Sequence, residues 1–117
     1  MKFHSSVNEA KEQLQKGVSP FVVLLQNGTL QVEYFAPKGT DTQTPHKQDE
    51  LYVITSGSSE FNRDGEIINC VTGDVLFVPA GMEHHFQNFS NDFATWVIFY
   101  GKEGGEKNEQ PGDFPPF

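Results

Sequence analysis

The most informative stretch of this chain is Gly73-Asp-Val-Leu-Phe-Val-Pro79-Ala-Gly81-Met-Glu-His84-His-Phe-Gln-Asn88. An apolar run, a turn built on proline and glycine, and a second short run follow one another, which is typical of two strands joined by a tight turn. His84 is among the first residues after the turn. A single histidine in this position is most often a satisfied surface or core residue, so a chemical role for His84 requires partners elsewhere in the chain.

Candidate partners lie upstream, in the stretch Thr44-Pro45-His46-Lys47-Gln48-Asp49-Glu50, which precedes an apolar run over residues 51–54. If this stretch is extended, period-two alternation places four side chains on one face: Thr44, His46, Gln48 and Glu50. An inward-facing carboxylate is costly unless a partner, a proton or a metal neutralises it. Together with His84, His46 and Glu50 form a candidate metal site that suits Fe, Mn, Ni or Zn and leaves open positions for water or substrate.

Both stretches resemble the paired motifs of the cupin superfamily. The second family motif has glycine, proline, glycine, histidine and asparagine at fixed spacing, and this chain matches it without a gap. The matching residues are Gly73, Pro79, Gly81, His84 and Asn88.

The first family motif has a glycine, two histidines two residues apart, a glutamate and a closing glycine. With Gly57 as the closing glycine, Glu50 and His46 take the places of the glutamate and the second histidine. The first histidine position falls on Thr44, and Gly39 sits one residue closer than the family spacing. The usual family site has three histidines and a glutamate, so the resemblance implies a metal site in which one ligand differs.

Two residues are candidates for the missing ligand. Gln48 either contributes its amide oxygen as a weak fourth ligand or bonds a bound water or substrate. Metal ligation by Thr44 is the less favoured alternative, because neutral hydroxyls bind such cations poorly compared with imidazole.

Four neighbouring residues receive other roles. Phe86 and Asn88 share the face of His84 and are expected at the pocket wall, with Asn88 fixing strand geometry rather than binding metal. His85 faces the opposite side, toward solvent or an interface. Tyr52 is expected on the opposite face from Glu50, in the core or an interface.

The remaining pattern predicts an all-β fold, a double-stranded β-helix (jelly-roll) barrel with a short N-terminal helix. We expect one domain over residues 1–117, with the helix at about 6–16, the barrel at about 20–101 and a C-terminal tail at 102–117. Ser6 and Glu9 have the spacing of a capping box. The expected strands are 21–26, 29–36, 51–54, 59–62, 66–71, 74–78, 84–89 and 93–100.

Charge and composition restrict the partners. The net charge is −8, from sixteen acidic and eight basic side chains, which disfavours nucleic acid and anionic membrane surfaces. The first residues lack the apolar run of a signal peptide, and no stretch has the length of a membrane span, so a cytoplasmic location is expected. The single Cys70 is interpreted as a small core residue.

Strands that are apolar on both faces need a second sheet, the helix or a subunit interface to cover them, and a homodimer is therefore expected. In the tail, Phe114 and Phe117 either belong to a flexible acidic end or dock on the barrel or a partner.

Two functions remain open on the sequence. The first is a metal-dependent enzyme of dioxygenase, isomerase or lyase type acting on a small organic molecule, as the resemblance implies. The second is a non-catalytic small-ligand-binding or sensor protein with weak metal or none. A purely structural hydrogen-bond network is the least favoured interpretation, since it does not explain the spacing of both motifs.

Overall fold

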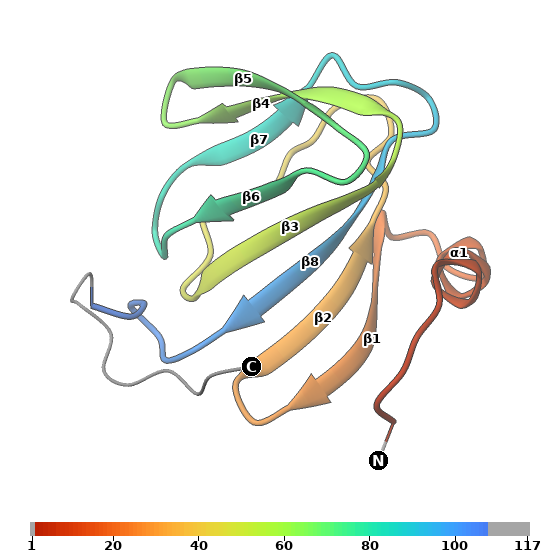
Figure 1. Ribbon diagram of the computed structural model, residues 1–117, viewed down its shortest axis with the longest axis horizontal. Helices are drawn as coiled ribbons and strands as arrows, with labels where there is room; N and C mark the ends of the chain where they lie inside the picture. The colour runs from red at the N-terminus through yellow and green to blue at the C-terminus, as the bar shows by residue number, and fades with distance from the viewer. Residues whose placement is uncertain (1, 108–117) are drawn as a thin grey trace.

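The computed structural model describes residues 2–107 and consists of one helix and eight strands in that range (Figure 1). The elements are α1 (Val7–Gln15), β1 (Phe21–Asn27), β2 (Leu30–Phe35), β3 (Asp49–Ser56), β4 (Ser58–Arg63), β5 (Glu66–Val71), β6 (Val75–Val78), β7 (His84–Gln87) and β8 (Ala94–Tyr100). The larger sheet has the order β1-β2-β8-β3-β6, and the smaller has the order β5-β4-β7. The strand pairs within these sheets are antiparallel.

The expected all-β fold with a short N-terminal helix is confirmed, and one detail differs. The two sheets do not join into a closed barrel, because their hydrogen-bonded ladders remain separate. The two sheets face each other in Figure 1, and a shared apolar core lies between them. The buried residues of this core are Phe35, Tyr52, Ile54, Phe61, Cys70, Leu76, Val78, Phe86, Phe93, Val97 and Phe99.

Helix α1 covers the outer side of the larger sheet beside β1 and β2 (Figure 1). It begins after Ser6, whose hydroxyl oxygen accepts a hydrogen bond from the backbone N–H of Glu9 at 3.0 Å. This capping contact satisfies one of the free N–H groups at the helix start. The helix buries Ala10 in a second cluster with Leu24 and Tyr34, so part of the double-faced apolar character of the strands is explained within the chain.

The two sheets are connected at Gly57, between β3 and β4. Gly57 has a φ of 73°, and an added Cβ would lie 2.4 Å from Oγ of Ser90 and 2.9 Å from Cα of Phe93. A side chain at this point would therefore meet both backbone strain and steric overlap. The glycine of the first sequence motif is thus required by the close approach of the 90–93 turn.

Residues 101–107 fold back onto the start of β3. The carboxylate of Asp49 is buried and accepts hydrogen bonds from the backbone N–H of Ala80 at 2.9 Å and of Glu106 at 2.8 Å. This segment was expected to be the start of a tail, and the structure gives it a fixed contact. The alternatives for Phe114 and Phe117 lie outside the described residues.

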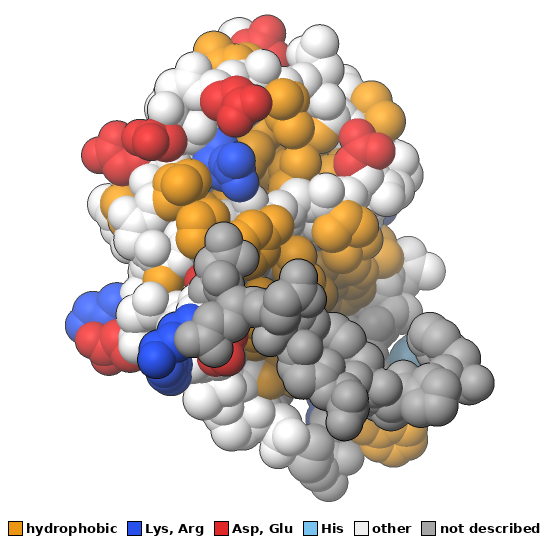
Figure 2. Space-filling model, turned by 60° about the vertical axis from the view of Figure 1, so that its left-hand side comes forward, with side chains coloured by type: hydrophobic (Ala, Val, Ile, Leu, Met, Phe, Trp, Pro, Cys, Tyr) orange, Lys and Arg blue, Asp and Glu red, His pale blue; other side chains and the backbone are white. Residues whose placement is uncertain are grey.

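One face of the molecule exposes hydrophobic side chains. Figure 2 shows this face, where orange side chains gather among a few charged ones. Strands β5 and β6 carry several large hydrophobic residues that are exposed: Ile67, Ile68, Val71, Val75 and Phe77. Among residues 2–107, no helix is both long and apolar enough to cross a membrane.

Candidate metal centre

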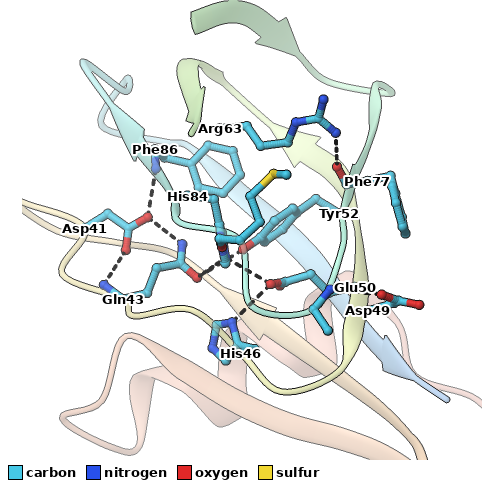
Figure 3. Close-up of polar contacts among 12 residues, drawn as sticks. Asp41, Gln43, His46, Asp49, Glu50, Tyr52, Arg63, Phe77, His84 and Phe86 are labelled. Carbon is cyan, nitrogen blue, oxygen red and sulfur yellow. Dashed lines mark hydrogen bonds and ion pairs between the residues drawn. The ribbon is translucent and has the colours of Figure 1, made fainter. Parts of the chain in front are cut away.

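The fold brings His46, Glu50 and His84 together from three places in the chain (Figure 3). Glu50 is on β3 in the larger sheet, His84 opens β7 in the smaller sheet, and His46 lies in the loop before β3. Oε1 of Glu50 is 3.0 Å from Nδ1 of His46 and 2.9 Å from Nε2 of His84. The three candidate ligand atoms all lie within 4.8 Å of one another.

The turn at Pro79–Gly81 aims His84 into this site. The backbone N–H of Gly81 donates to the carbonyl oxygen of His46 at 2.8 Å, which holds the turn against the loop before β3. Nδ1 of His84 is 2.9 Å from the carbonyl oxygen of Met82, and as N–H it donates to that oxygen. This bond keeps Nδ1 protonated and directs Nε2 at Glu50, so that Nε2 donates to Glu50 when the ring is a protonated imidazolium and is a free ligand atom when the ring is neutral.

Glu50 is 1 % exposed and only one of its two carboxylate oxygens is satisfied. Oε1 accepts from both histidines, whereas Oε2 has no hydrogen-bond partner within the part of the chain that the structure describes. Burial alone would raise the pKa of Glu50, but the hydrogen bonds from His46 and His84 outweigh it and hold the pKa below its usual value. Burial likewise disfavours charge on His84, and its hydrogen bond to Glu50 still raises the pKa of His84.

A further polar side chain in the site, Gln43, was not found from the sequence. Its Oε1 lies 3.1 Å from Nε2 of His84 and accepts the hydroxyl of Tyr52 at 3.0 Å. Its Nε2 donates to Asp41 at 2.6 Å, so the network determines that the amide oxygen faces the histidine. No periodic pattern could have found Gln43, because residues 41–48 belong to no strand.

The two fourth-ligand candidates from the sequence do not reach the centre. Thr44 is exposed. The amide of Gln48 donates to the carbonyl oxygens of Thr29 at 3.0 Å and Gly101 at 2.7 Å. The assumption of an extended stretch over 44–50 was wrong, because the chain bends at 47–48 and strand alternation begins only at Asp49.

The expected position of Tyr52 was also wrong. Glu50 and Tyr52 are two residues apart on one strand, so their side chains share a face, and the tyrosine ring centroid lies 6.1 Å from that of His84. Tyr52 is fully buried, and burial, followed by the charge of Glu50, raises its pKa well above the usual value. Tyr52 therefore remains a neutral hydrogen-bond donor to Gln43.

The residues expected at the pocket wall differ from each other in position. Phe86 is buried, packs against the Tyr52 ring with centroids 4.9 Å apart, and donates its backbone N–H to Asp41. Asn88 is exposed, with a φ of 51°, and its amide donates to Glu60. The structure therefore places Phe86 behind the site and Asn88 away from it. His85 follows His84 with its Nε2 3.1 Å from Oε1 of Gln87.

The site opens to solvent on the side of His46. The His46 side chain is 34 % exposed, compared with 1 % for Glu50 and 0 % for His84. Its ring packs on Phe99 with centroids 4.8 Å apart. A cavity of about 1500 Å³ is lined by residues that include His46, Gln43 and Phe99, so a small molecule can approach the cluster from this side.

These residues fit a divalent transition metal. Two ligand atoms that each lie about 2.1 Å from one ion, at a right angle, stand about 3 Å apart, which is close to the separations of the Glu50 oxygen from the two histidine nitrogens. The buried Oε2 atom, which lacks a partner in the described chain, would gain one if an ion bound both carboxylate oxygens of Glu50. Imidazole and carboxylate are also the ligand types that Fe, Mn, Ni and Zn share.

A two-sheet antiparallel β fold with two histidines and a glutamate converging between the sheets defines the class of protein. The chain belongs to the cupin family: the family model described as "Cupin domain" matches residues 31–100, which contain the whole candidate site.

Comparison with known proteins gives two relatives by sequence. An uncharacterized protein of Streptomyces coelicolor is 40% identical over 60 residues, which cover 51% of this chain and 57% of the relative. Acireductone dioxygenase of Drosophila melanogaster is 33% identical over 78 residues, which cover 62% of this chain and 42% of the relative. The chain thus spans about half the length of these relatives.

The fold is also found in solved structures. A Cupin 2 conserved barrel domain protein from Salinispora arenicola has a TM-score of 0.65 and 17% sequence identity, with 86% of this chain and 89% of that chain covered. This likeness concerns the fold alone.

Proposed function

We propose that this protein is a metal-dependent enzyme of dioxygenase type that acts on a small organic molecule. The metal is a divalent transition ion, and His46, Glu50 and His84 are its ligands. The observation that carries the proposal is the buried carboxylate of Glu50, whose Oε1 lies beside two histidines and whose Oε2 has no partner in the described chain. A buried carboxylate oxygen in this state is expensive unless an ion completes its surroundings.

The protein residues have separate tasks in this proposal. Glu50 supplies negative charge from the larger sheet, and His84 supplies a nitrogen whose direction Met82 fixes. Gln43 directs its amide oxygen at the same point and is itself oriented by Asp41 and Tyr52. When bound, the ion would supply Lewis-acid chemistry and open positions for substrate oxygens.

The dioxygenase type is preferred over isomerase or lyase types because one sequence relative is named acireductone dioxygenase. The similarity covers less than half of that relative, so the substrate is described only as a small organic molecule with metal-binding oxygens. The open side at His46 suits such a molecule, since it leads from solvent to the cluster.

Oxygen consumption tests this function. The purified protein is loaded separately with Fe(II), Mn(II), Ni(II) or Zn(II) and supplied with a panel of small diols, hydroxyketones and phenolics. We expect the Fe(II)-loaded protein to consume oxygen with at least one compound and to release an oxygenated product detectable by mass spectrometry. The His84→Ala variant should lose this activity, whereas His85→Ala should retain it because His85 is not part of the cluster.

Equal oxygen consumption by His84→Ala and the wild type would contradict the proposal. A second candidate function is a non-catalytic small-ligand-binding protein. The presence of Gln43 near the centre favours it, because a neutral amide that already bonds Tyr52 and Asp41 holds a cation less tightly than imidazole does. Metal and ligand binding without conversion of any compound would support this second function.

A further inference from the structure

Glu33 places a second carboxylate beside the candidate metal centre. Strand pairing across β2, β8 and β3 gives two neighbouring rows: Glu33, Val97 and Tyr52 in one, and Gln31, Phe99 and Glu50 in the next. Side chains of directly paired residues point to the same side of a sheet. Glu33 therefore shares the interior face with Glu50 and Tyr52, and it lines the same cavity as His46.

The surroundings of Glu33 do not neutralise it. Its Oε2 accepts a hydrogen bond from Nε2 of Gln31 at 2.6 Å, and no lysine or arginine of the described chain forms an ion pair with it. Burial raises the pKa of Glu33, and the charge of Glu50 adds to this effect, while Gln31 and His46 oppose it. A bound molecule that donates hydrogen bonds to a half-buried carboxylate of this kind stabilises it.

Among the Asp, Glu, Lys and Arg side chains around the cavity, the buried and half-buried ones are all acidic. Three such carboxylates are present: Glu33 and Asp41 line the cavity, and Glu50 adjoins it beside His46. The other charged residues of the cavity lining are exposed: Lys11, Lys38, Lys47 and Asp92. Three carboxylates already exceed the charge of a divalent ion, so no positive charge is left inside for a phosphate or carboxylate group on a bound molecule.

We propose that Glu33 determines which organic molecules the site accepts: it takes a hydrogen bond from a hydroxyl or amino group and disfavours molecules that carry a phosphate or carboxylate. This inference rests on the metal-dependent function proposed above. The ligand class is an uncharged or cationic small molecule that binds metal through its oxygens.

Three probes that share one pair of hydroxyl groups test this selection. They are 3,4-dihydroxybenzoate, catechol and 3,4-dihydroxybenzylamine, which carry a negative charge, no charge and a positive charge. Dissociation constants are measured by calorimetry on the Zn(II)-loaded protein at a pH where Glu33 is ionised, about pH 8. We expect catechol to bind at least about ten-fold tighter than 3,4-dihydroxybenzoate, and the amine to bind at least as tightly as catechol.

Variants assign the effect to Glu33. Glu33→Gln keeps the shape of the side chain and removes its charge. The dissociation constant of 3,4-dihydroxybenzoate divided by that of 3,4-dihydroxybenzylamine should therefore fall by about ten-fold, while the zinc content stays the same. Glu33→Asp keeps the charge and should retain the wild-type order of the probes. The matched control is Glu12→Gln, on the exposed side of α1, which should leave all three dissociation constants unchanged.

The outcomes separate this inference from the proposed function. If the wild type binds zinc but binds 3,4-dihydroxybenzoate as tightly as catechol, the role proposed for Glu33 is contradicted. The proposed metal-dependent function is not contradicted by that result. The same conclusion follows if Glu33→Gln preserves the wild-type ratio, or if it loses zinc and so proves to be a metal ligand itself. A wild type that takes up no metal overturns the proposed function and this inference with it.

Discussion

At the scale of single residues, the candidate site depends on which amide faces it. Gln43 and Gln48 are five residues apart in the same loop, but only Gln43 directs its oxygen at His84, at 3.1 Å. Gln48 instead bonds the backbone of two distant turns. The two glutamines therefore form a matched pair for testing the structure against the interpretation drawn from the sequence.

The Gln43→Ala variant should bind Zn(II) about ten- to a hundred-fold more weakly than the wild type. It loses an amide oxygen that is directed at the proposed ion position and that helps to orient the ring of His84. Gln48→Ala should retain wild-type zinc affinity even if it is less stable. Competition titration against a zinc-binding dye measures both constants. The opposite ranking of the two variants would show that the loop is arranged differently.

At the scale of elements, the turn before β7 is held by the start of β3. Asp49 accepts hydrogen bonds from Ala80 in this turn and from Glu106 in the segment after β8. One buried carboxylate thus joins three parts of the chain next to the candidate ligands. His84 can face the site because this turn is fixed on the side of the larger sheet.

The Asp49→Ala variant should lower the free energy of unfolding by about 3 kcal/mol, because two backbone N–H groups lose a charged acceptor. Urea denaturation measures the change. Glu103→Ala is the control. Glu103 is exposed, and its carboxylate lies 3.8 Å from the amine of the exposed Lys47; surface ion pairs of this kind contribute little to the free energy of unfolding. Equal stability of the two variants would contradict the role given to Asp49.

Regular elements could be predicted from the sequence, whereas the irregular loop could not. Alternating apolar residues and turn signals located the strands to within a few residues, and the fixed spacing of the second motif located His84. The loop over 41–48 has no period, so Gln43 was missed and Gln48 was given a role it does not have. The position of Tyr52 could have been predicted, because alternation from Glu50 places it on the same face.

At the scale of the whole molecule, the exposed hydrophobic residues of β5 and β6 are consistent with an interface (Figure 2). The homodimer expected from the sequence stays a prediction. The acidic net charge of −8 would add to the selection against anionic molecules that we propose for Glu33.

The stability of the metal-free protein should have a maximum at mildly acidic pH. The pKa of Glu50 is lowered from 4.5, so its contribution is present above that value and is lost as the pH falls through the folded-state pKa. The pKa of His84 is raised from 6.5, so its contribution is present below that value and is lost as the pH rises through the folded-state pKa. The maximum therefore lies between these two ordinary values.

Urea denaturation in the presence of a chelator, at a series of pH values, measures this profile. Glu50→Gln should flatten both limbs, because the histidine loses the carboxylate that raises its pKa. A profile that is the same in Glu50→Gln and the wild type would mean that the ion pair does not form.

The central claim is that His46, Glu50 and His84 bind a metal ion, and the metal content of the purified protein tests it most directly. Elemental analysis is made after purification without a chelating resin and after titration with Fe(II), Mn(II), Ni(II) and Zn(II). The wild type and His85→Ala should hold close to one divalent ion per chain, while His46→Ala and His84→Ala should hold little or none. A wild type that binds none of these ions, or a His84→Ala variant that binds as much as the wild type, would contradict the claim.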